Sequence, residues 1–315
     1  MSSTTTMQRR PGLSPGAASP FNRQRLARAF TPYLLLLPAA ALYAIFIVYP
    51  IYRQFDISFY DWHIFPGVPS PGVGFRNYSA LFHDSEVKTA AINTLLFTVI
   101  TVPVQMGLGL AAAALLTDRL PGRGLLRGLI FIPVIASWVV VSYIFAYIFA
   151  AQGGLANAVI SIFAGHAVHT DWLAQKWTGM AVIWMVSIWK GVGWSFIMYL
   201  AALDGVPRTL VEASRVDGAP ERRVWRHVIL PAIKPTTIFV LVLLVIGASQ
   251  VFTQVFLLTQ GGPYGSTQVL LGYAYDQAFT SFQFSYAAAM ASLMAVVVLA
   301  MSIIQIRVMR RGDLR

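Results

Sequence analysis

Apolar residues lie in six long blocks, which are separated by shorter and more polar segments. Each block has about 20 residues or more, enough for a helix to cross a hydrocarbon core of about 30 Å. The pattern predicts an all-α, polytopic membrane protein with six transmembrane helices. The predicted spans are approximately residues 31–52, 90–116, 125–150, 177–203, 236–258 and 285–308.

Residues 1–30 are rich in Ser, Thr, Pro, Gly and Arg and show no apolar periodicity. Such composition predicts a disordered tail, which leaves residues 31–315 as the transmembrane domain. A basic tail followed by an apolar block also resembles a signal peptide, but the apolar core of a signal peptide has only about 7–15 residues. The longer first block therefore predicts a retained span.

Composition agrees with a membrane protein, since 57% of the residues are hydrophobic and only 11% are charged. The net charge of +11 first suggests nucleic acid, but 18 of the 23 Lys and Arg lie in the two tails and in segments 118–127 and 204–235. This alternation follows the positive-inside rule. It predicts a multi-pass protein of the bacterial inner membrane with both termini cytoplasmic, and it argues against a nucleic-acid partner.

The chain offers little for catalysis or metal binding. It has no cysteine, and its five histidines are scattered, so we predict no metal site and no catalytic residue. No acidic residue lies inside a predicted span, and no internal repeat is visible. Both observations disfavour an ion-coupled secondary carrier, which remains an alternative, and a membrane-embedded enzyme is disfavoured for the same lack of clustered polar groups.

Segment 204–235 is unusually charged for this chain. Pro207 suits the start of a helix, which is predicted over 208–216, and Gly218 suits a left-handed residue that closes it. Pro220 then begins a second short helix, predicted to run to Val228. The segment is therefore expected to form a compact pair of helices beneath the membrane.

The same segment carries a spaced motif: Glu212-Ala213-Ser214, three residues, Gly218, nine residues, and Val228-Ile229-Leu230-Pro231. It resembles the loop of ABC importer permeases that docks on the ATPase, whose pattern is Glu-Ala-Ala, three residues, Gly, nine residues, Ile-x-Leu-Pro. Ser214 and Val228 are conservative departures. The resemblance implies ATPase-coupling roles for Glu212, Ala213, Ser214, Asp217, Gly218, Ala219, Leu230 and Pro231.

Further motifs resemble the carbohydrate (maltose and glycerol-phosphate-like) type of these permeases. They are Gly74-Phe75-Arg76-Asn77-Tyr78, Asn93-Thr94, Gly107-Leu108-Gly109-Leu110, Arg127, Gly154-Leu155-Ala156-Asn157, and Thr259-Gln260-Gly261-Gly262-Pro263 followed by Ser266-Thr267. One departure is Ser285-Tyr286, where Gly-Tyr is common. The implied function is import of a sugar, polyol or glycerophosphodiester-like solute by alternating access, and a permease for amino acids or peptides is the alternative within the family.

The resemblance also implies partners. No Gly-rich phosphate loop with Lys-Ser/Thr occurs, so the chain is not expected to be an enzyme or to hold a cofactor. ATP and Mg would instead bind two partner ATPase subunits. A second homologous permease, an extracytoplasmic solute-binding protein and membrane lipid complete the expected set.

Polar residues inside spans usually face a bundle interior or a water-filled path. Gln250 and Gln254, four residues apart, are expected on one helix face, and Lys190 lies near the middle of the fourth span with Gly191 and Trp194 close by. The resemblance implies that these spans line the sugar pocket, so all five are predicted substrate-pathway residues. Hydrogen bonding between spans, or a structural pairing of Lys190, is the competing explanation.

Overall fold

The structure, a computed structural model, describes residues 33, 35–65, 67–117 and 121–311. It divides into two units, residues 1–53 and residues 54–315. The predicted tail 1–30 lies outside the described residues. The described residues of the chain form helices and no strand other than an isolated bridge between Tyr60 and Gly72.

The first span candidate is the helix Leu35–Ile57, which continues five residues past its predicted end and into the second unit. Its middle widens into a π-helix, Ala44–Val48, before α2 (Tyr49–Ile57). Pro50 lacks the N–H that would donate to the Phe46 carbonyl, and the N–H of Tyr49 donates instead to the Ala44 carbonyl. A proline inside the helix thus accounts for the wider turn.

Within the described residues, three further unbroken helices are long and apolar enough to cross a membrane: α4 (Ser85–Thr117), α8 (Lys176–Asp204) and α15 (Phe284–Arg311). Two bent helix pairs raise the number of candidate spans from four to six. The second of these pairs joins Glu221–Ala232, which lies in the segment predicted beneath the membrane, to Lys234–Ser249 at an angle of 66°. Many large apolar side chains on these helices are exposed, as expected for surfaces that face lipid.

Two predicted spans differ from the observed helices. The span predicted over 125–150 bends by 97° between α5 (Arg123–Ile135) and α6 (Trp138–Ile148). Pro133 weakens the end of α5, and the Ser137 hydroxyl caps α6 by accepting from the Val139 N–H at 3.3 Å. The span predicted over 236–258 stops at the end of α12 (Lys234–Ser249) and resumes as α13 (Thr253–Leu258).

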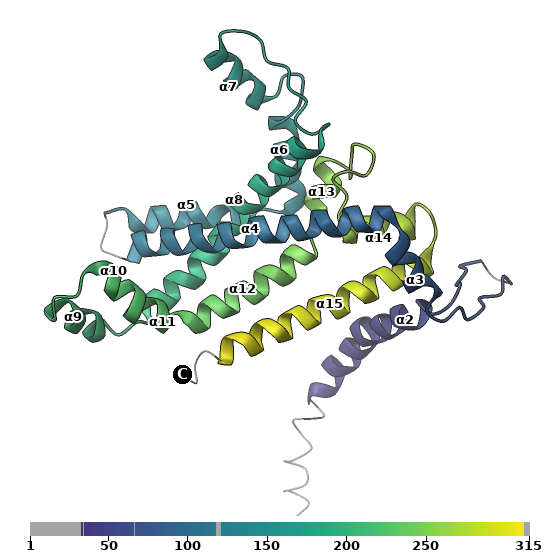
Figure 1. The fold of residues 1–315 in the computed structure, drawn as a ribbon, viewed down its shortest axis with the longest axis horizontal. Helices are drawn as coiled ribbons and strands as arrows, with labels where there is room; N and C mark the ends of the chain where they lie inside the picture. The colour runs from purple at the N-terminus through teal and green to yellow at the C-terminus, as the bar shows by residue number, and fades with distance from the viewer. Residues whose placement is uncertain (1–32, 34, 66, 118–120, 312–315) are drawn as a thin grey trace, which may run out of the picture. The chain divides into compact units, whose positions relative to one another are not determined.

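The core of the second unit is built on α4 and α8, which lie side by side (Figure 1). A Cβ atom placed on Gly109 of α4 would lie 2.6 Å from the Ser195 Cβ of α8, so only glycine allows this close approach. Buried residues of α8 such as Ile183 and Val186 pack in one apolar cluster with Val255 of α13.

Short helices join these elements. Segment 204–235 contains α9 (Arg208–Val216), α10 (Glu221–Val224), a π-helix (Trp225–Ile229) and α11 (Leu230–Ala232). The remaining helices are α3 (Arg76–His83), α7 (Leu155–Ala164) and α14 (Leu270–Phe279), the last of which packs against α15 and α4.

Candidate functional site

The predicted helix 208–216 is present with those bounds as α9. Gly218 has a φ of +73°, the left-handed conformation predicted for it, and the Ala219 N–H donates to the Ser214 carbonyl to close the helix. Pro220 precedes α10, as expected, but the helical segment runs beyond Val228 to Ala232 through the π-turn. The motif residues are thereby held in a compact pair of helices.

The motif helix borders a cavity of about 780 Å³ that also includes the end of α4 and Trp225. Glu212 lines it together with Arg208 and Arg215, and Arg215 donates to the Glu221 carboxylate at 2.7 Å. Glu212 is exposed, and the neighbouring Val216 has 87% of its surface exposed. The segment thus presents the exposed Val216 close to a cavity whose lining carries both positive and negative side chains.

A second cavity, which we call the glutamine cavity, lies where α12 ends, against α4 and α8. Its volume is about 310 Å³. Hydrogen bonds join residues of its lining: the Gln254 Nε2 donates to the Ser187 Oγ at 3.4 Å, and the Gln105 Nε2 donates to the Ser187 carbonyl at 3.2 Å. Its polar lining consists of Thr101, Gln105, Ser187, Gln250, Thr253 and Gln254.

Three of the five predicted pathway residues line this cavity, namely Gln250, Gln254 and Gly191. The two glutamines do not share one continuous helix face, because the chain leaves the helix between them. Gln250 and Gln254 nevertheless both line the glutamine cavity. Trp194 lies outside the lining and packs against a separate apolar cluster, which includes Phe196 and Tyr199 of α8.

Lys190 also lies outside the lining of the glutamine cavity. Its side chain is 6% exposed, and its Nζ donates to the carbonyl oxygens of Pro133, Val134 and Ala136 at 2.9, 3.1 and 2.7 Å. These carbonyls end α5 at the 97° break, where the helix leaves them without partners. An ammonium has three protons to donate, so all three are used in capping this helix.

Sequence reasoning missed most of the glutamine cavity's lining, of which Gln105 and Trp138 are two instructive examples. Gln105 is a buried amide inside α4, and its presence within an apolar block was a usable signal. Trp138 begins α6, and its ring centroid lies 5.0 Å from the Lys190 Nζ. Its position follows from the helix break and could not be read from the pattern of apolar residues.

Two of the sequence motifs meet in space. The Asn93 Nδ2, fully buried in α4, donates to the carbonyls of Ser266 and Gln268 at 2.8 Å each. The neighbouring Thr94 accepts from the Leu270 N–H at 3.0 Å. These contacts hold the 259–269 loop, which follows α13, against α4. The Asn93-Thr94 motif and the motif in this loop are thus joined directly by hydrogen bonds.

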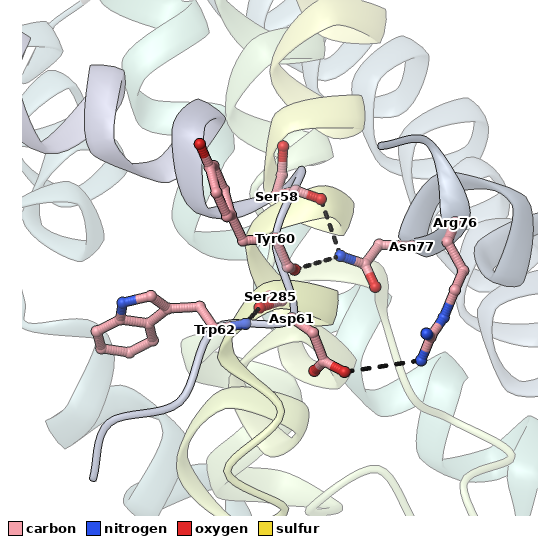
Figure 2. Close-up of polar contacts among 7 residues, drawn as sticks. All are labelled: Ser58, Tyr60, Asp61, Trp62, Arg76, Asn77 and Ser285. Carbon is pink, nitrogen blue, oxygen red and sulfur yellow. Dashed lines mark hydrogen bonds and ion pairs between the residues drawn. The ribbon is translucent and has the colours of Figure 1, made fainter. Parts of the chain in front are cut away.

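A third motif organises the segment between α2 and α3, as Figure 2 shows. The Asn77 amide donates to the carbonyls of Ser58 and Tyr60 at 2.9 and 3.0 Å, and Arg76 lies 3.8 Å from the Asp61 carboxylate. A side-chain amide thus satisfies two carbonyls of a turn, which fixes the start of the loop that follows.

Ser285, at the position where the motif usually has glycine, makes a side-chain hydrogen bond. The Ser285 Oγ, at the start of α15, accepts from the Trp62 N–H at 2.7 Å (Figure 2). Glycine has no side chain with which to make this bond. The Trp62 ring also meets the Phe284 ring edge-on at 5.6 Å, so the loop after α2 is tied to α15 at two adjacent residues.

Asp84, just before α4, joins α4, α14 and α15. Its Oδ2 accepts from the hydroxyls of Tyr273 and Tyr286 at 3.0 and 2.6 Å, and its Oδ1 accepts from the Glu86 N–H at 2.8 Å. Burial raises the pKa of Asp84, but hydrogen bonds from Tyr286, Glu86 and Tyr273 outweigh it, so the pKa lies below the ordinary 3.8.

We predict that Asp84→Asn lowers the unfolding temperature of the purified protein near neutral pH. Because the folded pKa is depressed, the stabilisation by Asp84 is present above the unfolded pKa of 3.8 and is lost as pH falls through the lower folded value. The cost near neutral pH is about 1 kcal/mol for this partly exposed group, or roughly 2–4 °C. Thermal unfolding at several pH values measures it. Asp171→Asn, at an exposed loop position, is the matched control, and equal unfolding temperatures for the two variants would contradict the prediction.

Helices long and apolar enough to cross a membrane, a charged pair of short helices between α8 and α12, and a polar cavity among the long helices are together typical of a multi-pass transport protein. Residues 105–311 match the family model described as "Binding-protein-dependent transport system inner membrane component". The chain therefore belongs to this family of inner-membrane transport components.

Two relatives and one solved structure illustrate the likeness. The chain is 32% identical to the sulfoquinovosyl glycerol transport system permease protein SmoG of Agrobacterium fabrum, covering 89% of this chain and 90% of SmoG. It is also 32% identical to the lactose transport system permease protein LacF of Rhizobium radiobacter, covering 87% and 92%. A chain of a bacterial alginate ABC transporter, crystallised with an alginate pentasaccharide-bound periplasmic protein, shares the fold, with a TM-score of 0.81, 23% identity and coverage of 92% and 97%.

Proposed function

We propose that this chain is a permease subunit of an ATP-driven, binding-protein-dependent importer and forms part of the path for a sugar or related polyhydroxylated solute. The observation that carries the proposal is the glutamine cavity, which opens at the break between α12 and α13 and is lined by amides and hydroxyls. Such groups exchange hydrogen bonds with hydroxyls in both directions. The permease names of the relatives, which include lactose and sulfoquinovosyl glycerol transport, support the same solute class.

In this proposal the solute is delivered by an external binding protein to the loops around Asn77 and the 259–269 segment. A second, similar permease completes the path. Two ATPase subunits bind ATP and Mg and grip the α9–α11 segment through Glu212, Gly218 and their neighbours. Their closure moves the spans so that the cavity is open alternately to the two sides of the membrane.

In this proposal the glutamine cavity binds the solute without making or breaking a covalent bond in it. Gln250, Gln254 and Gln105 each offer one acceptor and two donor protons, and the Trp138 and Phe252 rings of the lining provide apolar faces. Hydroxyls then find polar partners while C–H faces pack on rings. Weak, distributed contacts of this kind suit a path from which the solute must also leave.

The test is uptake into vesicles that contain the complete transporter. The ATPase subunits face the inside of the vesicle, and the binding protein is added outside. We expect uptake to require ATP and to persist when an ionophore collapses the proton gradient. The matched control is the same preparation with a non-hydrolysable ATP analogue, for which uptake is expected to fall to the background of empty vesicles. Uptake driven by a proton gradient without ATP would contradict the proposal and favour the ion-coupled carrier.

A further inference from the structure

The charge of the cavity lining sets which solutes can cross. We propose that the solute is uncharged, so that this chain passes neutral polyhydroxylated molecules and excludes phosphorylated, sulfonated and carboxylated ones. The inference rests on the proposed import function and narrows it to one class of cargo.

The first observation is the composition of the glutamine cavity. Among the described residues that line it, the polar groups are three glutamines, two threonines and one serine, and none carries a charge. Moving an anion out of water requires a compensating charge or several directed donors. Two of the three glutamines already donate to Ser187. The cavity is thus polar enough for hydroxyls and poorly equipped to replace the hydration of an anion.

The second observation concerns Lys190, the one cation buried among the described helices near this cavity. Lys190 is not part of the cavity lining, and its Nζ lies 5.0 Å from the centroid of the Trp138 ring, which is part of it. Each of its three protons is donated to a carbonyl at the end of α5. Those carbonyls carry the negative end of the helix dipole, so the positive charge is largely compensated where it stands.

The third observation is a neighbouring cavity of about 300 Å³, lined by Phe256, Gln260, Gln268, Gly272 and Asp276. We call it the Asp276 cavity. The Gln268 Nε2 donates to the Asp276 Oδ2 at 2.6 Å, which orients the carboxyl group. A carboxyl group with amides and an aromatic ring suits sugar hydroxyls, but its negative charge repels an anion. No lysine or arginine is among the described residues that line this cavity.

Phe256 and Phe252 place the linings of the two cavities in contact. The two rings stack with centroids 5.2 Å apart, Phe252 lines the glutamine cavity and Phe256 lines the Asp276 cavity. Tyr275 packs against both rings, at 5.1 and 5.5 Å. The described residues that line the two cavities therefore offer aromatic faces and neutral amides, and Asp276, the only Asp, Glu, Lys, Arg or His among them, repels anions.

The experiment places opposite charges at one position of the lining. Gln250 is exposed at the cavity, so Gln250→Glu and Gln250→Lys are compared in the complete transporter with radiolabelled probes. The neutral probes are lactose, maltose and trehalose, and the anionic probes are sn-glycerol 3-phosphate and sulfoquinovosyl glycerol. The same substitutions at Gln175, which is exposed and lies in neither cavity, are the control for a general effect of charge.

We expect the wild-type transporter to take up at least one neutral probe about tenfold faster than either anionic probe. For a neutral cargo, Gln250→Glu and Gln250→Lys are expected to slow uptake to a similar extent, within about threefold of each other. For an anionic cargo, the glutamate variant would instead be slower than the lysine variant by more than about tenfold.

Preferential uptake of an anionic probe, or strong asymmetry between the two Gln250 variants, would overturn the inference and leave the proposed import function intact. Failure of the wild-type transporter to take up any probe with ATP would instead count against the proposed function. If size-exclusion chromatography shows that a variant does not assemble, the uptake of neutral and anionic probes by the wild-type transporter decides the inference.

Discussion

Lys190→Met is expected to destabilise this protein more than any other single substitution considered. The methionine side chain has nearly the same length but no proton to donate. It leaves the carbonyl oxygens of Pro133, Val134 and Ala136 without the partner that they have at 2.7–3.1 Å. With water excluded from the surrounding span, we expect a loss of about 3–5 kcal/mol. Thermal unfolding in detergent and the yield of monodisperse protein both measure it.

Lys176→Met is the matched control, because Lys176 begins the same helix and its Nζ lies 5.3 Å from the Trp177 ring centroid. That contact is worth about 0.5–1 kcal/mol, so the control is expected to remain nearly as stable as the wild type. Equal stability of the two methionine variants would refute the capping role of Lys190.

Lys190→Arg separates capping from solute binding. The arginine retains the charge and several donors, so part of the stability is expected to return. If Lys190 acts only by holding the break, the variant that folds shows an unchanged KM for uptake. A change in KM with unchanged stability would instead support the sequence-based prediction that Lys190 contacts the solute.

Gly218→Val is expected to reduce transport at least about tenfold while the spans still insert. Gly218 has a φ of +73°, a conformation that costs a residue with a Cβ atom about 1–2 kcal/mol and a β-branched residue more. No neighbouring atom lies within 4 Å of a Cβ placed there, so the effect comes from the backbone and not from a clash. The turn that joins α9 to α10 would change, and with it the surface proposed to meet the ATPase.

The measurement is uptake and ATP hydrolysis by the complete transporter, together with the amount of ATPase that copurifies. Gly124→Val provides the control, because Gly124 is also exposed and free of neighbours within 4 Å but does not have a positive φ. We expect Gly124→Val to transport at close to the wild-type rate. Full transport by Gly218→Val would argue against the docking role of this segment, and Glu212→Gln tests the same role through charge.

The sequence predicted the bounds of a helix well where those bounds depend only on residues of the helix itself or next to it. Pro207 and Gly218 predicted the bounds of α9, and both lie at its observed ends. Long apolar blocks likewise predicted α4, α8 and α15 to within a few residues. In each case a proline, a left-handed glycine or a long apolar run acts through its own backbone and needs no distant partner.

The breaks within the spans were not predicted. Pro133 is a local signal near the first bend, but the carbonyls exposed at the bend after Ile135 are capped by Lys190, which lies 54 residues from Ala136 in the chain. The break after Ser249 places Gln250 and Gln254 in one cavity by a route other than the helical spacing on which their pairing was predicted. Apolar periodicity carries no information on such long-range pairing.

The different surroundings of two charged contacts have a consequence for the response of the protein to ionic strength. The Arg215–Glu221 pair is more than half exposed, so dissolved ions screen it, with a Debye length of about 8 Å near physiological salt. Lys190 is only 6% exposed, so its contacts are screened much less. Added salt would therefore weaken the contact between α9 and α10 and leave the bend after α5 unchanged. Of these two features, the pair of short helices is the one that responds to ionic strength.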